Sequence, residues 1–173
     1  GRRCKVDSQD IFIDNIIRFA GYHNLNTYRK IANFLNVTED SLKHWQSKTR
    51  CPSLKRLDQI SDKIGCWSYA LIQKDGDIFA EIELLRNNSR EILIKNLKEY
   101  FLQKGRFSWK DKAALFYGFV SEAALKSYFR EENFKTPPLK KLDEMASALG
   151  KPTYELIKEV KLIEKTDTRK NKE

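Results

Sequence analysis

Apolar residues recur every three or four positions along most of the chain, in short stretches that begin after Ser or Thr and end near Asn or Gly. This spacing gives an α-helix one apolar face, and the flanking residues are favoured helix caps. The first half of the chain is expected to hold five helices: one capped by Ser8, one by Thr27, one by Thr38, one that starts at Pro52 and Ser53 and ends before Gly65, and a short one from about Trp67 to Ile72.

The same spacing predicts which side chains point inward. They are Ile11, Phe12, Asn15 or Ile16, and Phe19 in the first helix, Ile31, Ala32 and Leu35 in the second, Leu42 and Trp45 in the third, and Leu54, Leu57, Ile60, Ser61 and Ile64 in the fourth. Asn36 lies where the second helix must end, and Asn tolerates the left-handed backbone that a helix terminus often needs.

The pattern then occurs a second time. The segment 41–45 (SLKHW) matches 124–128 (ALKSY), and 52–58 (PSLKRLD) matches 137–143 (PPLKKLD). The offset is 83 residues at Leu42 and Leu125 and 85 at Leu54 and Leu139, so the second copy has two extra residues in the loop before its Pro. So many matches in one order indicate an internal repeat.

Five helices are therefore expected in the second copy as well. They are 90–104 with Ile92, Ile94, Leu97 and Phe101 inward, a helix opened by Ser108 or Trp109 that contains Ala113, Ala114 and Tyr117, a helix capped by Ser121 with Leu125 and Tyr128 inward, 138–149, and 153–162. The predicted fold is all-α, with domains at 8–75 and 90–164, a linker at 76–89 and a polar tail at 165–173. Within the linker, 78–85 (IFAEIELL) suits a helix or a short strand, and a helix is favoured.

The composition indicates which class of binding partner is favoured. Lys and Arg number 33 against 24 Asp and Glu, a net charge of +9, which favours a polyanion through phosphate neutralisation. A merely basic soluble protein is the alternative, and only the placement of the charges can decide. Seven Gly and four Pro disfavour an all-β fold rich in tight turns.

Other classes of function find little support. Cys4, Cys51 and Cys66 are odd in number, and neither C-x-x-C nor H-x-x-x-H spacing occurs, so structural thiols in a reducing compartment are expected, with no metal and no cofactor. Catalytic motifs are also missing, and His23 and His44 stand alone, so the chain is not expected to be an enzyme. No apolar run approaches the ~18 residues of a membrane span, and nothing resembles a signal peptide. The sequence begins with Gly rather than Met, as a piece of a longer protein would.

The segment 28–38 (YRKIANFLNVT) resembles the second helix and turn of helix-turn-helix domains of the Cro/phage-repressor type, also called XRE-like. That family has a small Ala between the two helices, an aliphatic residue three positions later, Gly or Asn, another aliphatic residue, and Ser or Thr. Here these are Ala32, Leu35, Asn36, Val37 and Thr38. The family pattern continues through Leu42, Trp45, Pro52, Ser53, Leu54, Leu57, Gly65, Tyr69 and Ile72. The resemblance covers 11–72, and less closely 92–157.

The resemblance implies two tandem five-helix domains that bind double-stranded DNA, with the third helix of each in the major groove. Base edges would be read by Thr38, Glu39, Asp40, Ser41, Lys43 and His44 in the first domain and by Glu122, Ala123 and Lys126 in the second. Phosphates would be contacted by Tyr28, Arg29, Lys30, Ser47, Lys48, Arg50, Lys55, Arg56, Lys110, Lys112, Arg130, Lys135 and Lys140. Arg2, Arg3 and Lys5 could add a basic arm along a groove. For Glu39 and Asp40 the simpler role is stabilisation of the helix N-terminus.

The second copy departs from the family at its turn. If Gly118 is the turn glycine there is one residue too many before Ser121, and if Phe119 takes that place an aromatic residue stands where Gly or Asn is wanted. The family's usual role implies a cytoplasmic, nucleoid-associated transcriptional repressor of bacterial or phage type. A homodimer stays open, as does an adaptor that binds an effector protein through aromatic residues expected to be exposed, namely Phe116, Tyr117, Phe119, Phe129 and Phe134.

Overall fold

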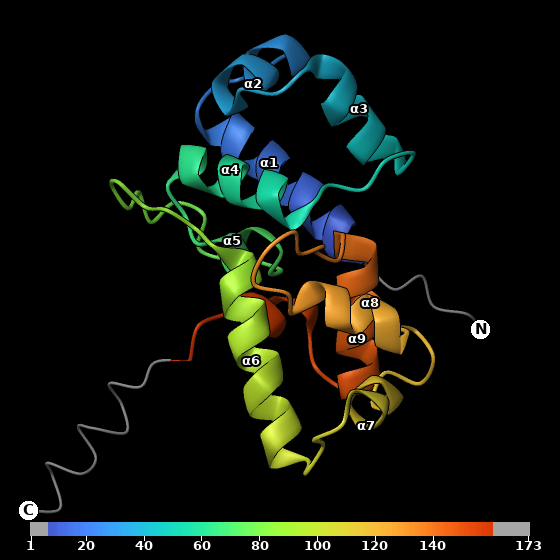
Figure 1. The fold of residues 1–173 in the computed structure, drawn as a ribbon. Helices are drawn as coiled ribbons and strands as arrows, with labels where there is room; N and C mark the ends of the chain where they lie inside the picture. The colour runs from blue at the N-terminus through green and yellow to red at the C-terminus, as the bar shows by residue number, and fades with distance from the viewer. Residues whose placement is uncertain (1–6, 161–173) are drawn as a thin grey trace, which may run out of the picture.

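The structure, a computed structural model, describes residues 7–160, and every regular element among them is a helix (Figure 1). In chain order they are α1 (Ser8–Tyr22), α2 (Tyr28–Leu35), α3 (Glu39–Ser47), α4 (Leu54–Ile64), α5 (Ser68–Leu71), α6 (Ser89–Gln103), α7 (Trp109–Ala114), α8 (Glu122–Tyr128), α9 (Leu139–Leu149) and the 3₁₀ helix η1 (Thr153–Ile157). The all-α prediction is confirmed for these residues.

Side-chain caps set where most of these helices begin. Five hydroxyl-bearing residues accept a hydrogen bond from the backbone N–H three positions on, namely Thr27, Thr38, Ser53, Ser108 and Ser121. The predicted cap at Ser8 is wrong, because Asp7 caps α1 by accepting from the Asp10 N–H, and Ser8 is the first, buried residue of the helix.

Left-handed residues end α2, α4 and α9. Asn36 has φ 57°, Gly65 has φ 84° and Gly150 has φ 67°. The positions of Gly65 and Gly150 correspond in the repeat, so the two copies stop the equivalent helix in the same way.

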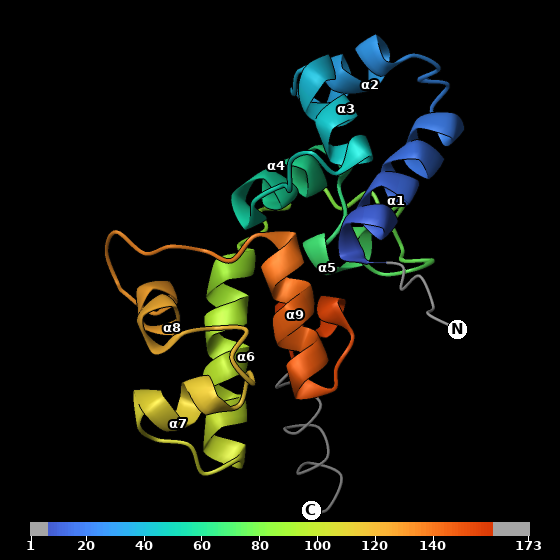
Figure 2. The same cartoon turned by 90° about the vertical axis from the view of Figure 1, so that its right-hand side faces the viewer.

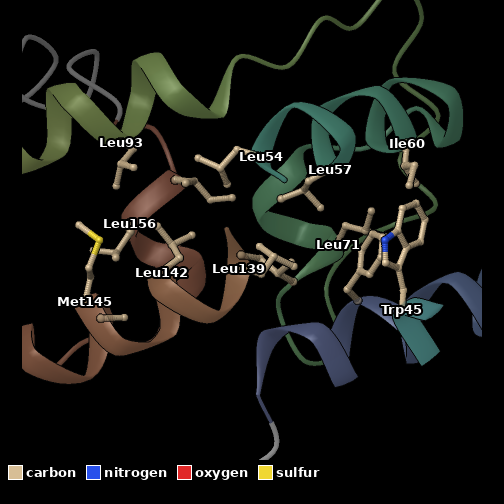
Figure 3. Close-up of a cluster of buried hydrophobic side chains, with 14 of the residues drawn as sticks. Trp45, Leu54, Leu57, Ile60, Leu71, Leu93, Leu139, Leu142, Met145 and Leu156 are labelled. Carbon is tan, nitrogen blue, oxygen red and sulfur yellow. The ribbon is translucent and has the colours of Figure 1, made fainter. Parts of the chain in front are cut away.

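We call residues 8–71 (α1–α5) the first unit and residues 89–157 (α6–η1) the second unit. One continuous apolar core runs through both, and Leu54 and Leu57 of the first unit lie close to Leu139 and Leu142 of the second (Figure 3). All four side chains are buried. Because these apolar side chains are buried between the units, the two units share one core and form one body.

The units contact each other reciprocally. Helix α1 packs against α9 while α4 packs against α6, and α5 lies against η1. The Asp58 carboxylate accepts from the Ser89 N–H at 2.9 Å, and the Asp143 carboxylate accepts from the Ser8 N–H at 3.2 Å. Ser8 and Ser89 correspond in the repeat, as do Asp58 and Asp143. An interface in which each half gives the same two groups to the other is that of a two-fold rotation.

A side-chain amide repeats in the same manner inside each unit. The Asn15 side chain donates to the carbonyls of Leu71 at 2.9 Å and Gln73 at 3.1 Å. The Asn96 side chain donates to the carbonyls of Leu156 and Lys158, both at 3.0 Å. In each unit this amide ties the long first helix to the end of the short fifth helix, which would otherwise leave these carbonyls without a helical partner.

The predicted helix over 78–85 is wrong. No helix or strand occurs between α5 and α6, and Glu81 and Leu84 both have left-handed backbones, with φ 47° and 56°. Ile78 is fully buried, whereas Leu84 is almost fully exposed. The apolar residues thus anchor an irregular connection, whose Ile82 N–H donates to the Gly65 carbonyl at 2.9 Å.

Three details of the second unit also differ from prediction. Leu93 rather than Ile92 faces the core from α6. Helix α7 ends at Ala114, so Tyr117 is not helical. The fifth helix is the 3₁₀ helix η1, which stops at Ile157 rather than Leu162; residues 161 and 162 lie outside the described part of the chain, as do the predicted tail 165–173 and the arm with Arg2, Arg3 and Lys5.

Candidate functional site

The segment from α2 to α3 presents a short helix on the surface of the first unit. Ala32 and Leu35 of α2 are buried, and the Val37 N–H donates to the Ala32 carbonyl at 3.0 Å across the Asn36 bend. The small Ala32 side chain lets α2 and α3 approach closely, and the left-handed Asn36 turns the chain between them. Thr38 then caps α3.

Helix α3 has a buried face and an open face. Leu42 and Trp45 point into the core, where the Trp45 ring meets Phe12 edge-on with 5.7 Å between ring centroids. The predicted base-reading residues lie on or beside the open face: Thr38, Asp40 and Lys43 are exposed, and Glu39, Ser41 and His44 are half-buried. The helix can therefore meet a large ligand along its outer side without opening the core.

Several of these polar side chains are held by neighbours. The Thr38 hydroxyl donates to the Ser41 hydroxyl at 2.9 Å, and His44 Nδ1 pairs with the Thr49 hydroxyl at 2.7 Å. The Lys43 ammonium lies 5.9 Å from the centroid of the Tyr28 ring, while the Tyr28 hydroxyl hydrogen-bonds Gln46. These contacts link the start of α2 to α3 and limit the freedom of the outer side chains before any ligand binds.

Cations lie around α3. Of the predicted phosphate-contacting residues in the first unit, Tyr28, Arg29, Lys30, Ser47, Lys48, Arg50 and Lys55 are exposed, and Arg56 is half-buried. They sit at the start of α2, at the end of α3 and in the loop after it, and in the first turn of α4. Each of these segments belongs to α2 or α3 or follows α3 in the chain.

Lys48 differs from the rest of this cluster. Its ammonium lies 2.9 Å from an Asp7 oxygen and 2.8 Å from an Asp10 oxygen. The hydrogen bonds that its ammonium donates to Asp10 and Asp7 raise the pKa of Lys48. Partial burial works to raise the pKa of Asp7, but hydrogen bonds from Lys48 and the Asp10 N–H outweigh it and lower that pKa. The Asp7 and Asp10 carboxylates thus offset the positive charge of Lys48, which the sequence analysis assigned to a phosphate contact.

The second unit presents α8 in the corresponding way. Leu125 and Tyr128 are buried, whereas Glu122, Ala123 and Lys126 are exposed, with the Lys126 ammonium 3.6 Å from Glu122. Of the other predicted cations, Lys110, Arg130, Lys135 and Lys140 are exposed. Lys112 is half-buried, with its ammonium 4.4 Å from the centroid of the Trp109 ring.

The turn before α8 is longer than its counterpart before α3. After α7 the chain makes tight turns in which Tyr117 and Gly118 both have left-handed backbones, with φ 50° and 88°. The bend thus uses Gly118, with the extra residue, rather than Phe119. Phe116 becomes fully buried and Tyr117 is 78% exposed. The prediction that Phe116 and Phe129 are exposed is wrong, because Phe129 packs between Phe101 and Trp109.

Sequence reasoning missed two residues that fix the far ends of α3 and α8. The Gln9 amide donates to the Trp45 carbonyl at 2.9 Å and the Arg50 carbonyl at 2.8 Å. The Arg90 guanidinium donates to the carbonyls of Tyr128 at 2.8 Å and Arg130 at 2.6 Å. Gln9 and Arg90 occupy the same position in the repeat, which is the signal that could have revealed them.

In the comparisons with known proteins, no family model matches the chain, and neither a curated protein nor a solved structure matches it. Within residues 7–160, no helix is both long and apolar enough to cross a membrane. In the same part of the chain no three His, Cys, Asp or Glu side chains gather as metal ligands would.

Proposed function

We propose that the chain binds double-stranded DNA in a sequence-specific manner and regulates transcription, as the resemblance of its sequence to the Cro/phage-repressor type implies. The observation that carries the proposal is the outer side of α3, with Thr38, Asp40 and Lys43 open to solvent beside exposed cations. A protruding helix of this kind fits the major groove, which is about 12 Å wide. The α2 segment would brace against the DNA backbone.

The charges supply the non-specific part of the affinity. Arg29 and Lys30 are exposed in the first turn of α2, and Arg50 and Lys55 are exposed in the loop after α3 and in the first turn of α4. With α3 in a groove, these cations would contact the phosphates beside it. The negative charge of Asp40 opposes this attraction. Asp40 contributes favourably only if it accepts a hydrogen bond from a base amino group or stabilises the N-terminus of α3.

The test is selection of bound duplexes from a random library, followed by binding of the selected duplex at several salt concentrations. We expect Lys43→Ala to relax the base preference, and Arg130→Ala to weaken all sequences alike and to lower the salt slope by about 1. Lys74→Ala is the matched control, because Lys74 is an exposed lysine in the turn after α5. Equal binding by all variants, or affinity that does not change with salt, would contradict the proposal.

A second candidate is an adaptor that binds an effector protein through the second unit. It is favoured by Tyr117 and Phe119, which remain 78% and 47% exposed at the long turn before α8. Aromatic side chains on a surface are common anchors of protein interfaces. An adaptor would leave the library selection without an enriched duplex.

A further inference from the structure

We infer that this chain is a dimer built into one polypeptide, and that a single copy reads two inverted, non-identical half-sites of DNA. The inference rests on the proposed function and adds to it the arrangement of the bound site. It follows from how the two units face each other, and from the side chains in which their outer helices differ.

The first step is the symmetry between the units. Tandem units related by a translation would bring α1–α5 against α6–η1 in a head-to-tail manner, with different groups on the two sides of the contact. Instead, Asp58 accepts a hydrogen bond from the Ser89 N–H and Asp143 accepts one from the Ser8 N–H. Helix α1 packs against α9, and α4 packs against α6. This isologous exchange is the mark of a two-fold axis. The axis passes near the contact of α5 with η1, which are equivalent elements of the two units.

The second step is the placement of the outer helices. In Figure 1, α3 and α8 both lie toward the right-hand side of the molecule, and α5 lies to their left, between the two units. Figure 2 shows α3 in the upper unit and α8 in the lower unit, separated along the long direction of the protein. Two helices related by a two-fold axis and facing the same way would meet DNA half-sites that run in opposite directions, as in dimers of single modules.

The third step is that the self-complementary surface is already occupied. Asp58, Asp143 and the pair α5 and η1 all face the other unit of the same chain. Leu54 and Leu139, in the equivalent first turns of α4 and α9, are buried. A second copy of the chain therefore cannot use this surface, and one chain supplies both reading helices.

The fourth step is the difference between the two helices. The offset of 83 residues pairs Glu39 with Glu122 and Lys43 with Lys126, but it also pairs Asp40 with Ala123 and Ser41 with Ala124. The shared Glu and Lys can make the same contacts in each half, whereas Asp40 and Ser41 can hydrogen-bond to a base edge and the two Ala residues cannot. The two half-sites should thus agree at some positions and differ at others.

The test uses the full chain and random duplexes, with the mass of the complex measured by native mass spectrometry. We expect one chain per duplex and an imperfect inverted repeat whose halves are centred about 10 base pairs, or a multiple of that, apart. A direct repeat, a single half-site, or a palindrome bound by two chains would overturn the inference while leaving DNA binding intact. Absence of any enriched duplex would instead sink the proposed function, and this inference with it.

Variants make the test sharper. The double variant Asp40→Ala with Ser41→Ala gives α3 the side chains of α8 at these positions, and it should change one half of the selected motif so that the halves become more alike. Ala123→Asp with Ala124→Ser should change only the other half. Thermal unfolding confirms that both variants fold, and Lys74→Ala should leave the motif unchanged. If the α3 variant changes both halves equally, two copies of α3 read the site and the inference is wrong.

Discussion

The Asp58 carboxylate accepts two hydrogen bonds from Ser89, one from the backbone N–H at 2.9 Å and one from the hydroxyl. The Ser68 hydroxyl also donates to this carboxylate, at 2.7 Å. In the other unit, the Asp143 carboxylate accepts hydrogen bonds from the Ser8 N–H and from the Thr153 hydroxyl, the latter at 2.7 Å. One aspartate in each unit therefore joins its own short fifth helix to the first residue of the partner unit's long helix.

Replacing Asp58 should weaken the contact between the units. Asp58→Ala leaves the Ser89 N–H and the Ser68 hydroxyl without this acceptor in a half-buried place, and we expect unfolding to become easier by about 2 kcal/mol. Urea denaturation followed by circular dichroism measures this change. Asp14→Ala removes an exposed carboxylate from α1 and should cost less than about 0.5 kcal/mol. Equal stability of the two variants would show that the Asp58 contact contributes nothing.

The same carboxylate should make stability depend on pH. Burial raises the pKa of Asp58 above its ordinary value, although hydrogen bonds from Ser89 and Ser68 work to lower it. A raised folded-state pKa means that the contribution of this group is largest below about pH 3.9 and is lost as the pH rises through the raised value. Asp58→Asn does not titrate and keeps an oxygen for the Ser89 N–H. From pH 3 to pH 7, we expect the free energy of unfolding of the variant, measured by urea denaturation, to rise relative to that of the wild type. A difference between the two that does not change with pH would contradict this.

Caps and apolar spacing made most of the helices predictable. Thr27, Thr38, Ser53 and Gly65 each carry local information, since a hydroxyl or a missing Cβ decides where a helix starts or stops whatever the rest of the fold does. The connection at 78–85 was not predictable, because a long-range contact buries Ile78 and holds the segment in an irregular path. Spacing alone does not distinguish such an anchor from a helix face.

The candidate site was predictable in outline and not in its ion pairs. The exposed side of α3 follows from Leu42 and Trp45 being apolar three residues apart. The ion pairs of Lys48 with Asp7 and Asp10 join residues about 40 positions apart, and nothing in the local sequence indicates them. The relation between the units likewise depends on Ser8 and Ser89, whose role appears only when the two copies are seen together.

The repeated side-chain amide of Asn15 and Asn96 gives a prediction about both units. Asn15→Asp would turn a donor into a carboxylate that faces the carbonyls of Leu71 and Gln73, a repulsive arrangement of acceptors, and should cost about 3 kcal/mol. Asn96→Asp should cost less, because Asn96 is only half-buried whereas Asn15 is buried. Urea denaturation of both variants gives the order. Asn33→Asp, at an exposed position of α2, is the control, and a smaller loss for Asn15→Asp than for Asn96→Asp would contradict the argument.

The thiols should differ in reactivity. Cys66 is fully buried, and desolvation raises its pKa to about 12, so little thiolate forms at pH 8. Cys51 is half-buried, and burial also raises its pKa. In a Cys4→Ser background, a disulfide reagent such as DTNB should modify Cys51 slowly and Cys66 only after urea unfolds the chain. Cys51→Ser in the same background isolates Cys66, and its rapid modification in the native state would show that this region opens readily.

The ion pair of Lys48 gives the last prediction, which concerns the strength of DNA binding. Asp7→Asn with Asp10→Asn removes both carboxylates that face the Lys48 ammonium, and Asn at position 7 still caps α1. With its charge released beside the loop after α3, Lys48 becomes available to a phosphate, so we expect tighter binding and a salt slope steeper by about 1. Adding Lys48→Ala to the double variant should return the slope to that of the wild type. If the triple variant instead binds as tightly as the double variant, the gain comes from the lost negative charge alone and Lys48 does not touch the DNA.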